Sequence, residues 1–364
     1  LALMYLLHPV TAIKTAVETA LDPVTIELVT ALVLIRMFEI VLRERETLAA
    51  MMGAFKRYFG ATRGVIVSMP LLIGMLPSVG GAYFSAPMVD EATRGLDMGG
   101  EEKAFINYWF RHPWEYVLPL YPGLVLASAI SGLELRSLIL ANLPIAVLMM
   151  ALGFKLSMKQ ARGKVPAQLV KSDPKGSLLS FLPVGAVLAL VITFRVRLFI
   201  ALAVVVATLL VIHRYRGREL VRVLKHGLSM DVVLLIFGVM FFKGVMEATG
   251  AVSGVSQFLL EAGVPIMFAL VALPLLAGVL TGITIGYVGA ALPLLVSLPG
   301  GDSLAAVALA FAAGFTGVLI SPVHVCLVLT REYFHADMAG LYRRLIPPSL
   351  ILVAAGAVIY LILS

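Results

Sequence analysis

Residues 69–86 read MPLLIGMLPSVGGAYFSA, and residues 273–290 read LPLLAGVLTGITIGYVGA. The two stretches align without a gap at an offset of 204 residues. The matches that are hardest to attribute to chance pair Pro70 with Pro274 and Tyr83 with Tyr287. Shared leucine and glycine residues are common in any apolar sequence, whereas a proline and a tyrosine in one register are not. We therefore predict an internal repeat with helix-breaking residues inside each apolar copy.

Composition narrows the class of protein. The chain has 364 residues, of which 60% are hydrophobic and only 13% are charged, whereas soluble domains are about 45–50% apolar and about 25% charged. So few charges exclude a soluble enzyme and a disordered protein, and the single cysteine, Cys326, excludes a disulfide scaffold. Continuous apolar runs favour a polytopic α-helical membrane protein over an outer-membrane barrel, whose strands would alternate.

Apolar segments divide into plain and interrupted ones. A helix needs roughly 20 apolar residues to cross a bilayer. Plain spans are expected at 24–42, 135–152, 178–194, 197–213, 231–249 and 346–364. Two longer segments with Gly, Pro, Ser or Thr in the middle predict re-entrant helical hairpins at 64–89 and 266–296. Two more, interrupted by polar residues and proline, predict broken transmembrane helices at 104–131 and 304–332.

The positive charges favour one path of the chain through the membrane, which we call the threading. The net charge of +7 could suggest a nucleic-acid partner. If 24–42 runs from outside to inside, however, 21 of the 28 Lys and Arg residues fall in the loops that we expect in the cytoplasm. Positive residues mark the cytoplasmic side of membrane proteins. We therefore expect a multi-pass protein of a prokaryotic cytoplasmic (inner) membrane. Its expected partner is the lipid bilayer, and we expect no nucleic-acid partner.

The same threading gives the two repeats opposite orientations. Repeat one is 24–152 and repeat two is 231–364, while 153–230 holds basic cytoplasmic loops and two linking helices. Residues 1–23 are expected to be the tail of an absent first helix and an outside loop. Inverted repeats with interrupted helices are typical of secondary transporters, which bind their substrate near the midplane at the broken elements. The predicted fold class is an all-α polytopic membrane protein with inverted-topology repeats.

The hairpin turns supply the first candidate site residues. Broken helices free backbone N–H and C=O groups, which are tolerated at membrane depth only where protein buries them or where they line a cavity. Half-helix N-termini can bind anions, and freed carbonyl groups can bind cations, so Na⁺ at the hairpin tips is the metal we consider. The alternative is a glycine-rich packing turn. The substrate-binding candidates in these turns are Ser78, Gly80, Gly81, Thr281, Gly282 and Thr284.

The first broken helix contains a charge beside a proline. Arg111 and His112 precede Pro113 inside an apolar segment. A charged residue at membrane depth is costly and marks a functional site by default, and Arg111 could clamp a carboxylate or phosphate. The alternatives are an ion pair with Glu115 or snorkelling to the interface. Asn107 and Tyr116 lie about one helical turn on either side of Arg111 and join it as substrate-binding candidates.

The second broken helix carries Ser321, Pro322 and His324. We take Ser321 and His324 as further substrate-binding candidates, although a lone membrane histidine is more often a satisfied core residue. The ion-coupling candidates are Asp90, His112 and Glu115, because carboxylates and imidazoles can exchange protons. The alternative for Asp90 is a solvated charge at a helix end.

Two motifs resemble those of a known family. They are 77–91, PSVGGAYFSAPMVDE, and 104–123, AFINYWFRHPWEYVLPLYPG. Both resemble an uncharacterised prokaryotic membrane family, domain of unknown function family 401, and the resemblance covers nearly the whole chain. That family is grouped with the ion transporter superfamily, beside gluconate, lactate, citrate and dicarboxylate carriers. The resemblance implies hairpin and broken-helix tips that meet at mid-membrane, and a homodimer.

The predicted function is secondary active transport of a small, carboxylate-like organic anion, coupled to H⁺ or Na⁺, by alternating access around a midplane site. The alternatives are a membrane-embedded enzyme, a lipid-handling protein or a channel. Enzyme signatures are missing from the sequence, which has no His-Glu-x-x-His motif and no phosphate-binding loop. We therefore expect no enzymatic activity and no cofactor beyond the coupling ion.

Overall fold

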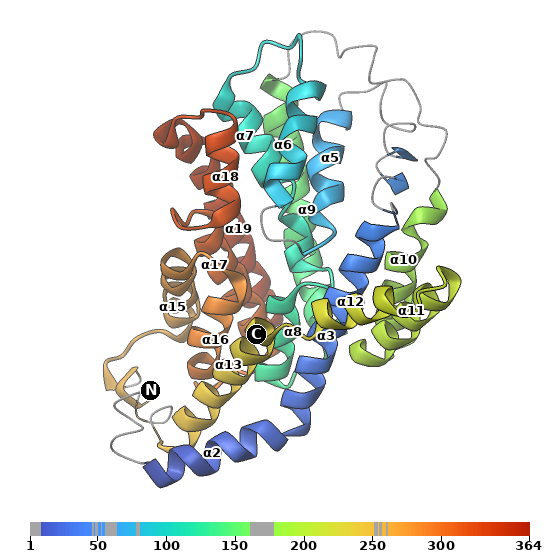
Figure 1. Ribbon diagram of the computed structural model, residues 1–364. Helices are drawn as coiled ribbons and strands as arrows, with labels where there is room; N and C mark the ends of the chain where they lie inside the picture. The colour runs from blue at the N-terminus through green and yellow to red at the C-terminus, as the bar shows by residue number, and fades with distance from the viewer. Residues whose placement is uncertain are drawn as a thin grey trace.

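The computed structural model of the chain describes residues 9–45, 64–77, 81–160, 178–250 and 261–364, together with 47, 50, 51, 53, 54, 254 and 257–259. Throughout these residues the regular structure is helical, without a strand. The predicted all-α class is therefore confirmed. Figure 1 shows the helices α15 to α19 beside the helices α5 to α9, with α3, α10 and α11 on the other side.

The first half of the chain forms short helices and two long ones. In order they are α2 (Pro9–Leu21), α3 (Pro23–Glu44), α5 (Gly64–Gly74), α6 (Gly81–Ala92), α7 (Gly100–Trp109), the 3₁₀ helix η1 (Pro113–Tyr116), α8 (Pro122–Ser131) and α9 (Leu135–Gln160). The expected segment 104–131 is thus divided among three helices. Helix α2 lies where we expected a helix tail and a loop, and it packs against α13 (Met230–Ala248).

The middle and second half continue in the same way. The linking segment holds η3 (Leu178–Phe181), α10 (Leu182–Leu188), the π-helical turn η4 (Ala189–Thr193), α11 (Leu198–Ile212) and α12 (Arg218–Gly227). After α13 come α15 (Ile266–Thr281), α16 (Thr284–Leu295), α17 (Leu304–Leu319), α18 (Val325–Tyr333) and α19 (Met338–Leu363). Helix α19 begins eight residues before the span expected at 346–364.

Side-chain caps fix several of these starts. The Asp22 carboxylate accepts the Thr25 N–H at 2.9 Å and begins α3. Ser303 does the same for α17, and Asp337 accepts the Gly340 N–H at 2.8 Å to begin α19. Each cap satisfies a backbone donor that the first helical turn cannot pair. These starts set where α17 and α19 enter the bundle.

Helix α17 lies at the centre of the second half. Every residue from Ala305 to Leu319 is buried. Glycines make this packing close, because a side chain on Gly317 would collide with the backbone oxygen of Leu275 in α15. A side chain on Gly278 would likewise collide with the backbone of Gly314. The end of α17 is thereby held against the end of α15.

Two of the described helices could cross a membrane, judged by length and composition alone. They are Leu135–Ser157 within α9 and Met338–Leu363 in α19, and less than half of each is buried inside the protein. Six shorter helices are also apolar. Large apolar side chains on α19, such as those of Leu361 and Ile362, are exposed. This surface is compatible with a membrane protein.

Candidate functional site

Two interruptions in the helices lie next to each other. Helix α7 ends at Trp109, and Pro113 prevents its continuation because proline has no N–H and its ring clashes with the preceding turn. Helix α17 ends at Leu319, and α18 begins after His324, which occupies the N-cap position. The Tyr108 hydroxyl donates a hydrogen bond to the Leu319 carbonyl oxygen at 2.9 Å. We call these interruptions break one (110–112) and break two (320–324).

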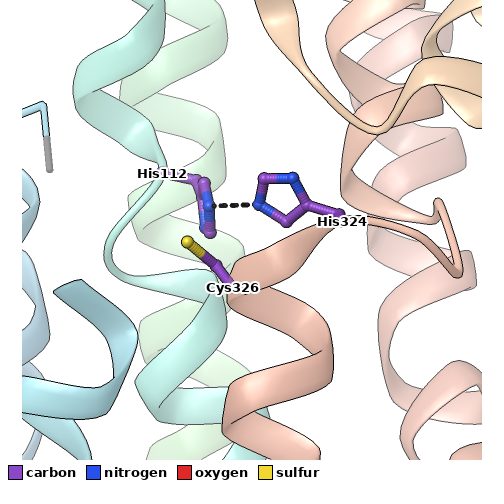
Figure 2. A group of neighbouring side chains, drawn as sticks. All are labelled: His112, His324 and Cys326. Carbon is purple, nitrogen blue, oxygen red and sulfur yellow. Dashed lines mark hydrogen bonds between the residues drawn. The ribbon is translucent and has the colours of Figure 1, made fainter. Parts of the chain in front are cut away.

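A pair of histidines joins the two breaks. The Nε2 atoms of His112 and His324 are 3.2 Å apart, although 212 residues separate them in the chain (Figure 2). The Nδ1 atom of His112 lies 2.6 Å from the Tyr108 carbonyl oxygen, and that of His324 lies 2.6 Å from the Gly282 carbonyl oxygen. Only 2% of His112 and 8% of His324 are exposed. Both rings are therefore buried, and each is anchored to one backbone carbonyl group.

Three more side chains complete the group. The buried Cys326 stands at the start of α18, and its sulfur atom lies within 4.8 Å of a ligand nitrogen of each histidine. The Thr284 hydroxyl donates to Glu115 Oε2 at 2.6 Å, and Glu115 Oε1 lies 4.0 Å from His112 Nε2. We call His112, Glu115, Thr284, His324 and Cys326 the junction cluster. Its two imidazoles, thiol and carboxylate can hold a cation or exchange a proton.

Several predicted site residues meet at or beside this cluster. Besides His112, Glu115, Thr284 and His324, the Gly282 carbonyl group takes part as the acceptor for His324. Gly282 has a φ of +64°, which favours glycine, and it ends α15. The Ser321 hydroxyl donates to the Val279 oxygen at 2.6 Å and so fastens break two to α15. Arg111 is 4% exposed and lies in break one.

Other predicted site residues have structural partners elsewhere. The Asn107 amide donates to the Ala82 oxygen at 2.9 Å and to the Thr330 hydroxyl at 3.1 Å, which ties α7 to α6 and α18. Tyr116 is buried and packs edge to face on Phe315.

The remaining candidates lie at helix ends. Thr281 is exposed, and its hydroxyl donates to the Ala277 oxygen of its own helix at 2.8 Å. Asp90 forms an ion pair with Lys103 at 2.8 Å near the end of α6. Gly81 is buried at the start of α6, whereas Ser78 and Gly80 lie outside the described residues.

Sequence reasoning missed two members of this region. In the sequence, Cys326 served only as evidence against disulfides. It follows His324 by two residues, at the start of a helix. Tyr108 supplies a carbonyl oxygen to His112 and a hydroxyl group that bonds to break two. A cysteine close to a histidine beside a proline break could have suggested a ligand set, whereas nothing in the sequence singles out Tyr108.

A cavity of about 330 Å³ is lined by residues at the ends of α5, α8 and α16. Its walls include Pro77 after α5, Pro122 at the start of α8 and Ile285 at the start of α16. Charged groups of α3 also line the cavity: Arg36 Nε donates to the His226 oxygen at 2.9 Å, and Glu39 pairs with Arg43 at 2.7 Å. The cavity offers space for a small polar molecule between α3 and the interrupted elements.

Comparison with known proteins adds a family match. The family model described as "Protein of unknown function (DUF401)" matches residues 2–363. No curated protein matches the chain. The match covers both halves and both breaks, and its description attaches no activity to them.

Proposed function

The chain belongs to the DUF401 family of proteins of unknown function, and we propose that it is a secondary active transporter of a small, carboxylate-like organic anion. In this proposal the helices span a cytoplasmic membrane in many passes, and an ion gradient of H⁺ or Na⁺ drives transport. The ion transporter superfamily, with its gluconate, lactate, citrate and dicarboxylate carriers, is the group to which we assign the architecture. The protein is proposed to act as a homodimer and not as an enzyme.

Similar contacts around the two breaks support the proposed repeat. In the first half, Trp114 Nε1 donates to the Leu71 oxygen of α5 at 2.6 Å, and the Tyr121 hydroxyl donates to the Gly74 oxygen. In the second half, Ser321 donates to the Val279 oxygen of α15 at 2.6 Å. Gly74 corresponds to Gly278 at the repeat offset, and each glycine gives a broken element space for close approach. The first broken helix thus packs near the end of α5, and the second packs near the end of α15.

One observation carries the proposal, which is that polar groups of the two halves meet in a single, largely buried cluster. His112 of break one faces His324 of break two at 3.2 Å, and Thr284 of α16 donates to Glu115 of η1 at 2.6 Å. In transporters with inverted repeats, the substrate binds between the repeats, near the midplane at their broken elements. We assign that role to the junction cluster, and we propose that the hairpins and broken helices move together against the plainer helices, so that the site opens to each side in turn.

Arg111 is the residue that we propose to attract the anion. Its side chain is buried in break one, directly before His112 in the chain. A guanidinium group matches a carboxylate in a bidentate geometry and stays charged at any physiological pH. His112 and Glu115 remain the candidates for ion coupling, whereas Asp90 is engaged with Lys103.

Ligand-induced stabilisation tests this function. The purified chain in detergent is heated with a panel of carboxylates, in a chelator-treated buffer, while Na⁺ and pH are varied. We expect at least one carboxylate to raise the melting temperature, because a ligand at 100 times its Kd stabilises by about 2.7 kcal/mol. Arg111→Ala should abolish the effect, and Arg111→Lys should weaken it. Arg216→Ala, at an exposed position between α11 and α12, should keep it.

Uptake of the stabilising anion into proteoliposomes under an imposed ion gradient then distinguishes transport from simple binding. If no carboxylate stabilises the wild-type protein, or if Arg111→Ala responds like wild type, the anion-carrier proposal is wrong. Uptake that persists without any ion gradient and shows no saturation would favour the channel alternative.

A further inference from the structure

The protonation of the two junction histidines follows from their backbone partners. Each Nδ1 atom lies 2.6 Å from a carbonyl oxygen, that of Tyr108 for His112 and that of Gly282 for His324. A carbonyl oxygen can only accept a hydrogen bond, so each Nδ1 must carry the hydrogen. A neutral imidazole carries one hydrogen, and both Nε2 atoms therefore present lone pairs.

These two lone pairs face each other across 3.2 Å (Figure 2). Neither can donate to the other, so two neutral rings in this arrangement repel. The arrangement becomes favourable when a cation lies between the nitrogens, either a proton or a metal ion. The histidines alone do not decide between the two, but their surroundings do.

The spacing fits a metal ion. Zn²⁺ binds imidazole nitrogen at 2.0–2.1 Å with tetrahedral angles, which places two such nitrogens roughly 3.3 Å apart. The observed Nε2–Nε2 separation is 3.2 Å. Histidines that bind metals also donate their other N–H group to a carbonyl or carboxylate, which fixes the ring. Both histidines have this arrangement, which a proton shared between them would not require.

A third ligand comes from Cys326. Its sulfur and one nitrogen of each histidine all lie within 4.8 Å of one another, a distance that a side-chain rotation can shorten. All three residues are buried. Cys326 extends from the start of α18 toward the His112 ring (Figure 2). The chain places its only cysteine at this point.

We propose that His112 Nε2, His324 Nε2 and Cys326 Sγ bind one transition-metal ion of the Zn²⁺ type. Two nitrogens and one sulfur suit a borderline-soft ion, whereas Na⁺, Mg²⁺ and Ca²⁺ prefer oxygen ligands. Glu115 Oε1, 4.0 Å from His112 Nε2, is the nearest carboxylate oxygen for the fourth position, and its partner oxygen is held by Thr284. Structural Zn²⁺ sites are usually four-coordinate.

The site would link the two halves of the chain. His112 belongs to break one, while His324 and Cys326 belong to break two. A bound ion would therefore hold both breaks in one arrangement. This inference concerns binding and does not depend on transport, and its test contains no carboxylate.

Metal counting on the purified full-length chain tests the proposal. The protein is stripped with a chelator, incubated with Zn²⁺ alone, separated from unbound ion and analysed for metal content. We expect one Zn²⁺ per chain for the wild-type protein and for the control His213→Ala, whose histidine lies at the end of α11. Cys326→Ser and His324→Gln should each weaken binding by about tenfold or more.

A second readout identifies the sulfur ligand. Co²⁺ bound to a thiolate gives a charge-transfer absorption band in the near ultraviolet, which we expect in wild type and His213→Ala but not in Cys326→Ser. Serine differs from cysteine by one atom, so this variant is the least disruptive to folding.

The proposal is overturned if the wild-type chain retains no stoichiometric Zn²⁺. It is also overturned if Cys326→Ser and His324→Gln bind Zn²⁺ as tightly as wild type. The cation between the histidines would then be a proton. Either result leaves carboxylate stabilisation, measured without metal, as a separate test of the anion-carrier function.

Discussion

At the scale of single residues, the hydrogen bond between Thr284 and Glu115 can be tested directly by mutation. The hydroxyl lies 2.6 Å from Oε2, and it joins α16 to η1 across 169 residues of chain. Valine has the shape of threonine without the hydroxyl, so Thr284→Val removes this donor and little else. We expect a loss of about 1–3 kcal/mol in stability, because the bond is partly buried and its acceptor is a carboxylate.

Melting temperatures of the purified variants measure this effect. Thr284→Ser keeps the hydroxyl and should retain most of the wild-type melting temperature. In the Glu115→Gln background, Thr284→Val should cost less, because the charged acceptor is gone. Equal losses from Thr284→Val in both backgrounds would show that the bond contributes nothing specific.

Residue types in the junction cluster could be found from the sequence, but their meeting could not. Arg111, His112 and His324 are visible because each is polar in an apolar run next to a proline. The 3.2 Å between the two histidines arises from the packing of elements 212 residues apart, which no local pattern encodes. Cys326 carried no signal because one cysteine in an apolar helix is an ordinary core residue.

At the scale of helices, the turn between α15 and α16 shows why two similar threonines differ. Gly282 is left-handed and ends α15, Ile283 is extended, and α16 begins at Thr284. After this reversal, Thr281 is exposed and its hydroxyl donates a hydrogen bond within α15. Thr284 begins α16, and its hydroxyl donates to the Glu115 carboxylate. Spacing in the sequence predicted a break here but could not say which hydroxyl would face the site.

The packing of α15 on α17 positions break two, and it depends on Gly317. A methyl group there would meet the Leu275 oxygen and the Val279 nitrogen, which are backbone atoms that cannot rotate away. We expect Gly317→Ala to lower the melting temperature, because overpacking costs about 1–3 kcal/mol. That cost exceeds the roughly 0.5–1 kcal/mol that alanine gains over glycine in a helix.

Gly238→Ala is the matched control, since nothing lies within 4 Å of its added methyl group in α13. This variant should be neutral or slightly stabilised. If Gly317→Ala melts at or above the wild-type temperature, the close approach of α15 and α17 is not as the structure has it.

At the scale of the whole molecule, composition determined the helical class, while the arrangement of the halves came only from the structure. A charged fraction of 13% and long apolar runs suffice to predict an all-helical chain. The repeat of 69–86 in 273–290 suggested two equivalent halves. It could not reveal that polar groups of both halves share one largely buried cluster, because such contacts depend on how the halves dock.

The proposed membrane threading predicts opposite sides for two exposed positions. Asp302 lies between α16 and α17, which the threading places outside, and Arg216 lies between α11 and α12, which it places in the cytoplasm. Because Cys326 is the only cysteine, a Cys326→Ser background lets single new cysteines report their own side. In intact cells, a membrane-impermeant maleimide should label Asp302→Cys but should label Arg216→Cys only after the membrane is opened. Labelling of both positions from outside, or of Arg216→Cys alone, would contradict the threading and with it the inverted orientation of the two halves.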